Sequence, residues 1–275
     1  MKRIVTIQDI SCVGKCSLTV ALPIISAAGV EAAIVPTAVL STHTMFKNFT
    51  CKDLDDQILP IAGHWKSEGF TFDAFYTGYL ASAAQIEKVM TLIRELKTPE
   101  SLVIVDPAMA DNGRMYPAFD EKFPKEMAKL CAVADIVLPN ITEACYLTDT
   151  PYREVYDEAF AKEVVEKLAA LGAKKVVLTG ACYDGSYGVL LYDSETKEYF
   201  RYEQEKIDAA YHGTGDVFSS AFTGALVRGK SIEDSIRIAA DYTAECIRIT
   251  KARVGANWYG VDFESALPQL LASLA

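Results

Sequence analysis

The run LVIVD, residues 102–106, decides the fold that we expect for this chain. Four apolar residues follow one another without polar alternation, and the run ends on a carboxylate. Strands that are buried on both faces have this pattern, as in the parallel sheets of α/β proteins. Two further runs share it, IVL at residues 136–138 and KVVLT at residues 175–179. The first prediction is therefore a mostly parallel central sheet.

Amphipathic helical patterns separate these runs from other strand-like segments. Further strands are expected at residues 3–7, 32–40 and 72–76, with helices at residues 14–28, 53–68, 82–96, 125–133 and 156–171. A hairpin of residues 188–192 and 198–202 follows, and then helices at residues 214–228 and 232–250. Such alternation predicts a three-layer α/β fold with helices on both faces of the sheet. Because no linker or repeat interrupts the pattern, we expect residues 1–275 to form a single domain.

The composition narrows the class of protein. The 275 residues carry a formal net charge of −10, so a nucleic-acid surface, which needs a basic footprint, is not expected. No stretch reaches the ~18 apolar residues of a membrane span, and the first residues lack the pattern of a signal peptide. Seven scattered cysteines without a C-x-x-C pair are typical of free thiols in a reducing compartment. We therefore expect a cytoplasmic protein with neither membrane nor nucleic acid as a partner.

Polar side chains follow the predicted strands, at the edge where open α/β sheets bind their ligands. They include Asp9, Ser11, His43, Thr44, Tyr79, Asp106, Asp111, Asn140, Glu143 and Thr179. Several have a purely structural alternative: Ser11 could cap a helix, and Asn140 with Glu143 could form a capping box. Tyr79 could serve packing alone, and His43 could be a buried structural histidine. The gathering of these residues at strand ends favours a ligand site.

The segment HGTGDVFSS, residues 212–220, suggests what that ligand site could do. Gly213, Thr214 and Gly215 can point successive N–H groups into one concavity, and the following helix adds its positive end. An anion hole needs no lysine in such an arrangement. Asp216, in the first turn, could then accept the proton of a hydroxyl that attacks phosphorus. The simpler alternative is a carboxylate stabilised by the helix dipole, worth ~0.3–1 kcal/mol.

Two nucleotide-binding motifs are absent from the chain. No segment fits G-x-x-x-x-G-K-[ST], which excludes a P-loop enzyme. The glycines near Asp216 do not form G-x-G-x-x-G either, because Phe218 stands where the third glycine would be. A dinucleotide-binding Rossmann protein is therefore not expected.

In their order along the chain, the motifs resemble those of the ribokinase-like small-molecule kinases, and among these the pyridoxal (vitamin B6) kinase branch. The matching stretches are TIQDISCVGKCSLTVALPIISAAG, TAVLSTHT, TGYL, VDPAMADNGRMY, LPNITEACYL and HGTGD. The resemblance implies a ribokinase-like fold and ATP-dependent phosphorylation of the hydroxymethyl group of pyridoxal, pyridoxamine or pyridoxine. It also implies Mg²⁺ as cofactor, allows a monovalent cation, and implies a homodimer. The alternatives are a hydroxymethylpyrimidine or sugar kinase of the same fold, and a non-enzymatic nucleotide- or vitamer-binding protein.

The resemblance also implies a role for each candidate residue. Asp216 would be the catalytic base, and Gly213, Thr214 and Gly215 would form the anion hole. Asp9, Ser11, His43, Thr44 and Tyr79 would contact the substrate. Asp106, Asp111, Asn140 and Thr179 would lie on the nucleotide side, with Asp106 and Glu143 at the metal. The chain departs from the family at Ala110, where relatives often have glycine, and Asp216 stands where some relatives carry a cysteine, which favours the base mechanism.

Overall fold

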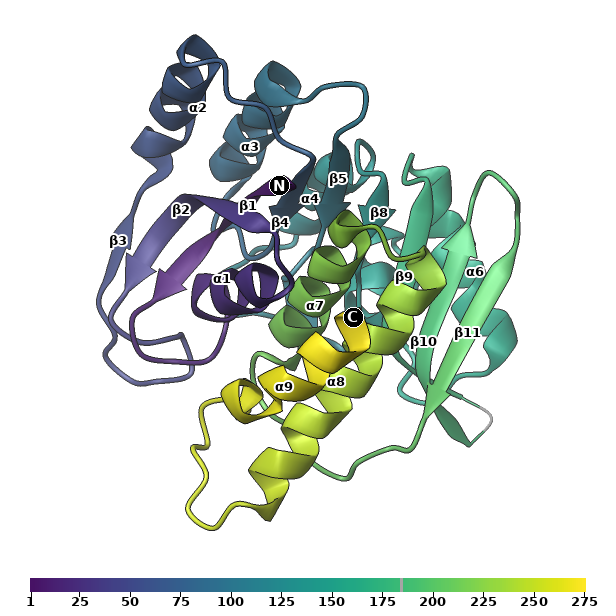
Figure 1. The fold of residues 1–275 in the computed structure, drawn as a ribbon. Coiled ribbons are helices and arrows are strands. Elements are labelled where there is room, and N and C mark those ends of the chain that lie inside the picture. Colours follow the sequence, from purple (N-terminus) through teal and green to yellow (C-terminus); the bar gives the residue numbers. More distant parts are fainter. Residues whose placement is uncertain (184) are drawn as a thin grey trace.

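The computed structural model describes residues 1–183 and 185–275, and one nine-stranded sheet runs through it in the order β11-β10-β9-β8-β5-β4-β1-β2-β3 (Figure 1). Six neighbouring strands are parallel: β9 (Lys175–Tyr183), β8 (Ile136–Val137), β5 (Leu102–Val105), β4 (Ala74–Thr77), β1 (Arg3–Ser11) and β2 (Glu31–Leu40). The edges are antiparallel: β3 (Cys51–Asp53) on one side, and the hairpin β10 (Ser186–Asp193) and β11 (Tyr199–Gln204) on the other. The predicted parallel sheet and the predicted hairpin are both confirmed.

Helices cover both faces of this sheet, so the predicted three-layer arrangement is confirmed. One face carries α1 (Leu18–Ala27), α7 (Thr214–Arg228), α8 (Ile232–Ala252) and α9 (Phe263–Leu274), which lie in front in Figure 1. The other carries α2 (Ile58–Ser67), α3 (Ala83–Leu96), α4 (Phe123–Cys131), α5 (Ile141–Leu147) and α6 (Glu158–Ala170). A short 3₁₀ turn, η1 (Asp55–Gln57), precedes α2.

The central strands are apolar on both faces because each face has its own core. In β1, Ile4 packs in the core beneath α7 and α8, whereas Val5 packs in the core beneath α3. Ile104 and Val103 of β5 divide in the same way, and all four side chains are fully buried. Since successive side chains of a strand point to opposite faces, a strand with two dry faces needs an unbroken apolar run.

The structure corrects the expected elements in several places. The helix expected from residue 14 begins only at Leu18, because Gly14 (φ 144°) and Ser17 (φ 51°) have backbone angles far from helical values. Four elements had no clear signal in the sequence: β3, the terminal helix α9, and the strands β6 (Ala110–Asp111) and β7 (Arg114–Met115), which form a small hairpin. These segments are short or lie outside the periodic pattern of the central strands.

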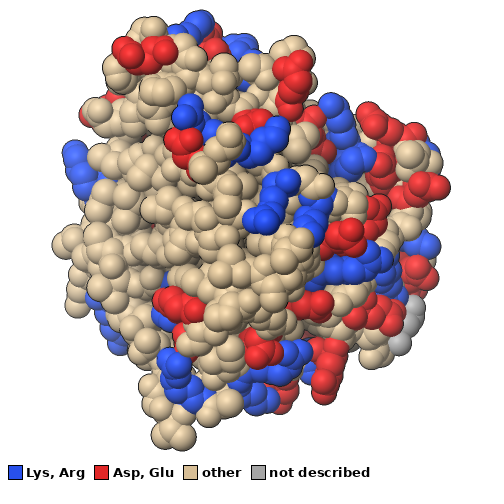
Figure 2. Space-filling model, in the orientation of Figure 1, with Lys and Arg blue, Asp and Glu red and all other residues tan. Residues whose placement is uncertain are grey.

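The surface carries mixed charge. On the face shown in Figure 2, Lys and Arg side chains are interspersed with Asp and Glu, in keeping with a net charge of −10. Within the described ranges, no helix has both the length and the apolar character needed to cross a bilayer.

Candidate active site

A cavity opens where β1, β2 and β4 end. It is lined by Asp9, Ser11, Cys16, Ser17, Leu40, His43, Thr44, Tyr79, Ala108, Tyr116, His212 and Asp216. All five residues predicted to contact a substrate, together with the predicted base, therefore lie around one space. The position agrees with the rule that open α/β sheets bind ligands at the carboxyl ends of their strands.

Asp216 lies in the first turn of α7 and lines this cavity. Burial raises the pKa of its carboxyl to about 8, and the negative charge of Asp106 adds to the increase. The polar backbone of Ser17 nearby opposes this rise in pKa. An aspartate whose pKa lies near the working pH is well matched to accept and release a proton.

The two glycines before Asp216 have different environments. Gly213 has φ 80°, and a Cβ added there would lie 1.9 Å from the carbonyl oxygen of Lys15, so both backbone angle and space require glycine. Gly215 already belongs to α7, and a Cβ added there would meet no protein atom within 4 Å. The first N–H groups of a helix have no partner inside it, so the start of α7 can hold an anion. The open side of Gly215 leaves room for that anion to approach.

Asp9 is held by two hydroxyl groups at the floor of the cavity. The hydroxyl of Ser17 donates to Oδ1 at 2.6 Å, and that of Ser11 donates to Oδ2 at 3.2 Å. Asp9 is only 4% exposed, and burial raises the pKa of its carboxyl against the effect of these two donors. Asp9 and Ser11, both predicted to contact the substrate, therefore form a hydrogen-bonded pair.

His43 is fixed in one tautomer by its backbone partners. Its Nε2 lies 3.0 Å from the carbonyl oxygen of Tyr259, and the N–H of Met45 donates to its Nδ1 at 3.3 Å. A carbonyl only accepts and an amide only donates, so the ring proton lies on Nε2. Burial lowers the pKa of His43, which keeps the ring neutral. Both nitrogens are thus engaged, and the ring carbons are what His43 offers to a ligand.

Other aromatic side chains complete the wall. The ring of His212 lies 4.6 Å from that of His43, and burial lowers its pKa to about 4. Tyr79 packs against Phe119 at 5.4 Å between ring centroids, and burial raises the pKa of its phenol to about 12. Thr44 is exposed at the rim. A flat, aromatic ligand would suit such a wall.

Asp106 and Glu143 form a pair of buried carboxyl groups beside the cavity. Asp106 follows β5 and accepts a hydrogen bond from Ser219 of α7 at 2.8 Å, while burial raises its pKa to about 6. Burial and the charge of Asp106 raise the pKa of Glu143 well above its usual range. Two buried carboxylates that repel each other would both be stabilised by a bound cation, and their oxygens are the ligands that Mg²⁺ prefers.

Glu143 also has the structural role left open by the sequence. Its Oε2 accepts the N–H of Asn140 and its Oε1 the N–H of Met109, while Asn140 Oδ1 accepts the N–H of Glu143, which completes a capping box. Among the residues described here, no cluster of three or more His, Cys, Asp or Glu side chains could hold a metal ion. The chain itself therefore offers a carboxylate pair and would leave further metal ligands to water or substrate.

The predicted nucleotide-side residues Asn140, Thr179 and Asp111 do not line the strand-end cavity. Asn140 and Thr179 are neighbours across a parallel bridge, and the Asn140 amide donates to the carbonyl of Ala110 at 2.8 Å. Asp111 is the exposed last residue of β6, outside the cavity, and its carboxylate accepts two hydrogen bonds from Asn112. The structure thus brings Asn140 and Thr179 together, and the Asn140 amide bonds the residue that directly precedes Asp111.

Sequence reasoning missed several residues that line the cavity. They are Cys16, Ser17, Leu40, Ala108, Tyr116 and His212. Cys16 and Ser17 lie in the segment predicted to be helical, residues 14–28. His212 directly precedes Gly213, where the predicted anion hole begins. Tyr116 follows the hairpin β6–β7, which the sequence did not predict. Of these residues, only His212 could have been found from the sequence, because the chain has just three histidines.

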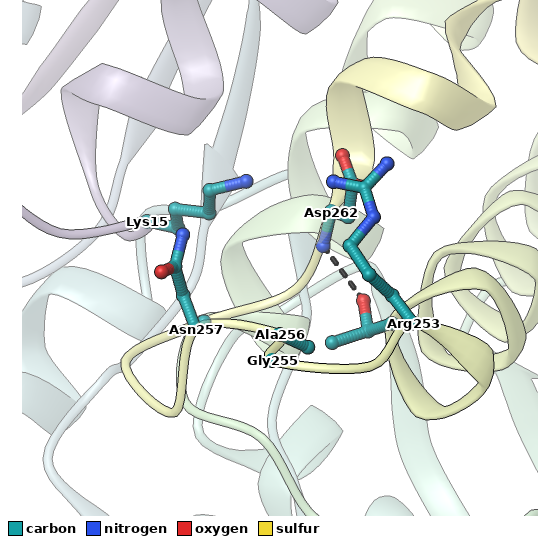
Figure 3. Close-up of a pocket in the computed structure, with 8 residues that line it drawn as sticks. Lys15, Arg253, Gly255, Ala256, Asn257 and Asp262 are labelled. Atoms are coloured by element: carbon teal, nitrogen blue, oxygen red, sulfur yellow. Dashed lines mark hydrogen bonds and ion pairs between the residues drawn. The ribbon is translucent and has the colours of Figure 1, made fainter.

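A second cavity lies between Lys15 and the segment of residues 253–262 (Figure 3). Its charged groups are already paired: Lys15 with Glu264 at 2.6 Å, and Arg253 with Asp262. The N–H of Asp262 donates to the hydroxyl of Thr250 at 2.7 Å, which closes the base of the segment. This cavity therefore has no net charge to offer a ligand, and the strand-end cavity remains the candidate site.

A helix N-terminus and an aspartate at the strand ends of an α/β sheet can bind a phosphate beside a small acceptor, which is the arrangement of a small-molecule kinase. The sequence pattern of the phosphomethylpyrimidine kinase family matches residues 21–262, and the chain belongs to this family. It is accordingly an ATP-dependent small-molecule kinase.

Individual relatives refine the comparison. The chain is 32% identical over 189 residues to pyridoxine kinase of Bacillus subtilis, with 66% of each chain covered. It is 27% identical over 198 residues to hydroxymethylpyrimidine/phosphomethylpyrimidine kinase of Aquifex aeolicus, with 71% of this chain and 74% of that one covered. A crystal structure of a candidate phosphomethylpyrimidine kinase from Bacteroides thetaiotaomicron, determined with pyridoxal, superposes with a TM-score of 0.93 at 37% identity, covering 98% of this chain and 95% of that one. The resemblance to ribokinase-like kinases of the pyridoxal kinase branch is confirmed.

Proposed function

We propose that this protein transfers the γ-phosphoryl group of ATP to the hydroxymethyl group of a B6 vitamer, pyridoxal, pyridoxamine or pyridoxine. The observation that carries the proposal is the presence of Asp216 in the same cavity as Asp9, Ser11, His43 and Tyr79, at the start of α7. A small aromatic alcohol in that cavity would have its hydroxyl near both a carboxylate and a helix N-terminus. The pyridoxal complex of the Bacteroides relative supports this class of acceptor.

In this mechanism Asp216 accepts the proton of the attacking hydroxyl. The backbone N–H groups of Gly213, Thr214 and Gly215 stabilise the negative charge of the phosphoryl group during transfer. Asp9 and Ser11 orient the polar groups of the acceptor, and His43, Thr44 and Tyr79 surround its ring.

The nucleotide lies on the side of Asn140 and Thr179 in this proposal, with Asp111 at the periphery. Asp106 and Glu143 would hold Mg²⁺, directly or through water, as their raised pKa values and oxygen donors suit a hard cation. When bound, the ion would neutralise charge on the phosphates of ATP.

The test is steady-state release of ADP with each vitamer and with hydroxymethylpyrimidine, for the wild type and Asp216→Asn. We expect turnover with at least one vitamer, and loss of turnover in Asp216→Asn with ATP affinity within a few-fold of the wild type. Near-normal turnover in Asp216→Asn would rule out the base mechanism. Binding of a vitamer without release of ADP would identify a binding protein instead.

Hydroxymethylpyrimidine is the second candidate acceptor. The observation in its favour is the family to which the chain belongs, together with the relative from Aquifex aeolicus. A higher kcat/KM for hydroxymethylpyrimidine than for every vitamer in the same assay would select this alternative.

We also propose that the enzyme is a homodimer of the cytoplasm. All seven cysteines are free thiols in the structure, which is typical of a reducing compartment. Light scattering after size exclusion tests the dimer.

A further inference from the structure

Ser17 has a backbone conformation that serine rarely adopts. Its φ of 51° and ψ of −135° lie in a region where glycine is strongly favoured. Glycine would fit there without strain, yet the chain has a residue with a side chain. Strained residues persist where the surroundings hold them, and they gather at functional sites.

The side chain of Ser17 does not cap the helix that it precedes, although its position predicts a cap. Ser17 is the N-cap of α1, but its hydroxyl makes no hydrogen bond to the first turn of that helix. The hydroxyl instead donates to Asp9 Oδ1 at 2.6 Å, and Asp216 lies in the same cavity. All three residues line the strand-end cavity. Ser17 therefore connects the loop before α1 to the carboxylate of Asp9 in β1.

We propose that Ser17 is a positioning residue that fixes the Asp9 carboxylate relative to Asp216 by donating the hydrogen bond of its hydroxyl to Asp9 Oδ1. The proposal rests on the proposed function, in which Asp9 orients the acceptor and Asp216 removes its proton. Two carboxylates in one cavity repel each other, and a donor bound to one of them holds it in place against that repulsion. With this unusual φ the Ser17 hydroxyl turns away from its own helix and toward Asp9. A fixed spacing of these two groups would align the acceptor hydroxyl with the base.

Two substitutions separate this role from a role in folding. Ser17→Gly removes the hydroxyl and the backbone strain and keeps the N–H, whereas Ser17→Ala removes the hydroxyl and keeps the strain. We expect kcat to fall about tenfold or more in both variants, because misplaced reacting groups are costly, with KM for ATP within twofold of the wild type. The Tm of Ser17→Gly should equal or exceed that of the wild type, and that of Ser17→Ala should not. Activity would then follow the hydroxyl and not the stability.

Lys197→Gly is the matched control. Lys197 also has a positive φ, 64°, but lies between β10 and β11, away from the cavity. Its replacement should raise Tm and leave kcat unchanged. A Ser17→Gly variant with wild-type kcat would overturn the proposal. So would a result in which kcat falls only in those Ser17 variants whose Tm also falls.

Crystal structures of the wild type and of Ser17→Gly give a readout that does not depend on activity. We expect the Asp9 carboxylate to shift relative to Asp216 in the variant, and unchanged positions would contradict the proposal. If the wild type phosphorylates none of the acceptors, the proposed function fails, while these two structures still decide whether Ser17 positions the carboxylates.

Discussion

The glycines that begin α7 show how one residue type serves two physical tasks. Gly213 is required by the protein itself, because its backbone angle and the nearby carbonyl of Lys15 exclude a side chain. At Gly215, by contrast, an added Cβ would meet no neighbouring atom within 4 Å, so the protein itself does not require glycine there. A helical position where alanine would be more favourable, and which nonetheless has glycine, points to space that a ligand uses.

Gly215→Ala should therefore stabilise the protein and impair the enzyme. Alanine in a helix is favoured over glycine by about 0.5–1 kcal/mol, so we expect a Tm increase of roughly 1–3 °C by thermal unfolding. The new methyl group occupies the approach to the anion hole, so kcat/KM for ATP should fall more than tenfold. Gly63→Ala, in α2 with equally open surroundings, is the control and should raise Tm without affecting turnover. Unchanged kcat/KM in Gly215→Ala would place the phosphate elsewhere.

At this scale the sequence predicts which side chains line the cavity better than how they act. Asp9 and Ser11 lie at the end of β1, and His43 follows β2. The ends of neighbouring parallel strands meet at one edge of the sheet, whatever the conformation of their loops. The tautomer of His43 depends on a carbonyl 216 positions later in the chain, that of Tyr259. The hydroxyl of Ser17 turns away from its own helix because φ is 51°. Neither a distant backbone partner nor a strained angle leaves a mark in residue spacing.

Among the elements, the segment between α8 and α9 has the least expected role. Its Tyr259 carbonyl holds His43, and the rings of Trp258 and Phe46 pack 4.6 Å apart beside it. A Cβ on Gly260 would lie 2.4 Å from Cβ of Lys15, so the segment lies tightly against the loop that precedes α1. This C-terminal segment therefore supports the substrate side of the cavity without lining it.

Gly260→Ala tests that support. The added methyl group must push the segment away from Lys15 and carry the Tyr259 carbonyl away from His43. Loss of one orienting hydrogen bond should raise KM for the vitamer about three- to tenfold, with KM for ATP unchanged in initial-rate measurements. Gly255→Ala is the control: it places alanine at a positive φ in the same segment, but its Cβ meets no atom within 4 Å. This variant should leave both KM values unchanged. Equal effects of the two variants would mean that His43 does not depend on the segment.

The predictability of the elements follows their burial. The strand at residues 102–105 and helix α7 lie in fully formed cores, and the sequence predicts both because burial imposes an apolar pattern. The hairpin β6–β7 has only two residues in each strand, too few for any period to show. Helix α9 has Pro268 inside it, which weakens a helical reading of its sequence.

For the whole molecule, the two cores on either side of one sheet stabilise the fold, whereas the buried carboxyl groups at the strand ends destabilise it. The sheet order places β1 between β2 and β4, and β5 beside β4, so that the ends of these strands and the start of α7 meet in one region. Asp106, Glu143 and Asp216 all have raised pKa values there, because burial disfavours their charged forms. The fold thus holds together acidic groups that would be better solvated in the unfolded chain.

The pH dependence of stability should show this opposition. Asp216 has a pKa of about 8 in the folded protein against 3.8 as its ordinary value, so between these values the folded state keeps a proton that the unfolded state has released. The stability linked to Asp216 is therefore fully present below about pH 4 and is lost progressively up to about pH 8. Asp216→Asn has no carboxyl group to titrate at this position, so its stability does not fall in this way as the pH rises.

Thermal unfolding of the wild type and of Asp216→Asn across pH 5–9 is the measurement. We expect the Tm of the variant to exceed that of the wild type by an amount that grows with pH and levels off near pH 8, at about 2 °C or more. Asp106→Asn is the comparison, with a gain that levels off nearer pH 6, where the pKa of Asp106 lies. A Tm difference for Asp216→Asn that does not change with pH would show that Asp216 is ionised throughout, and a base with an ordinary pKa would replace the one described here.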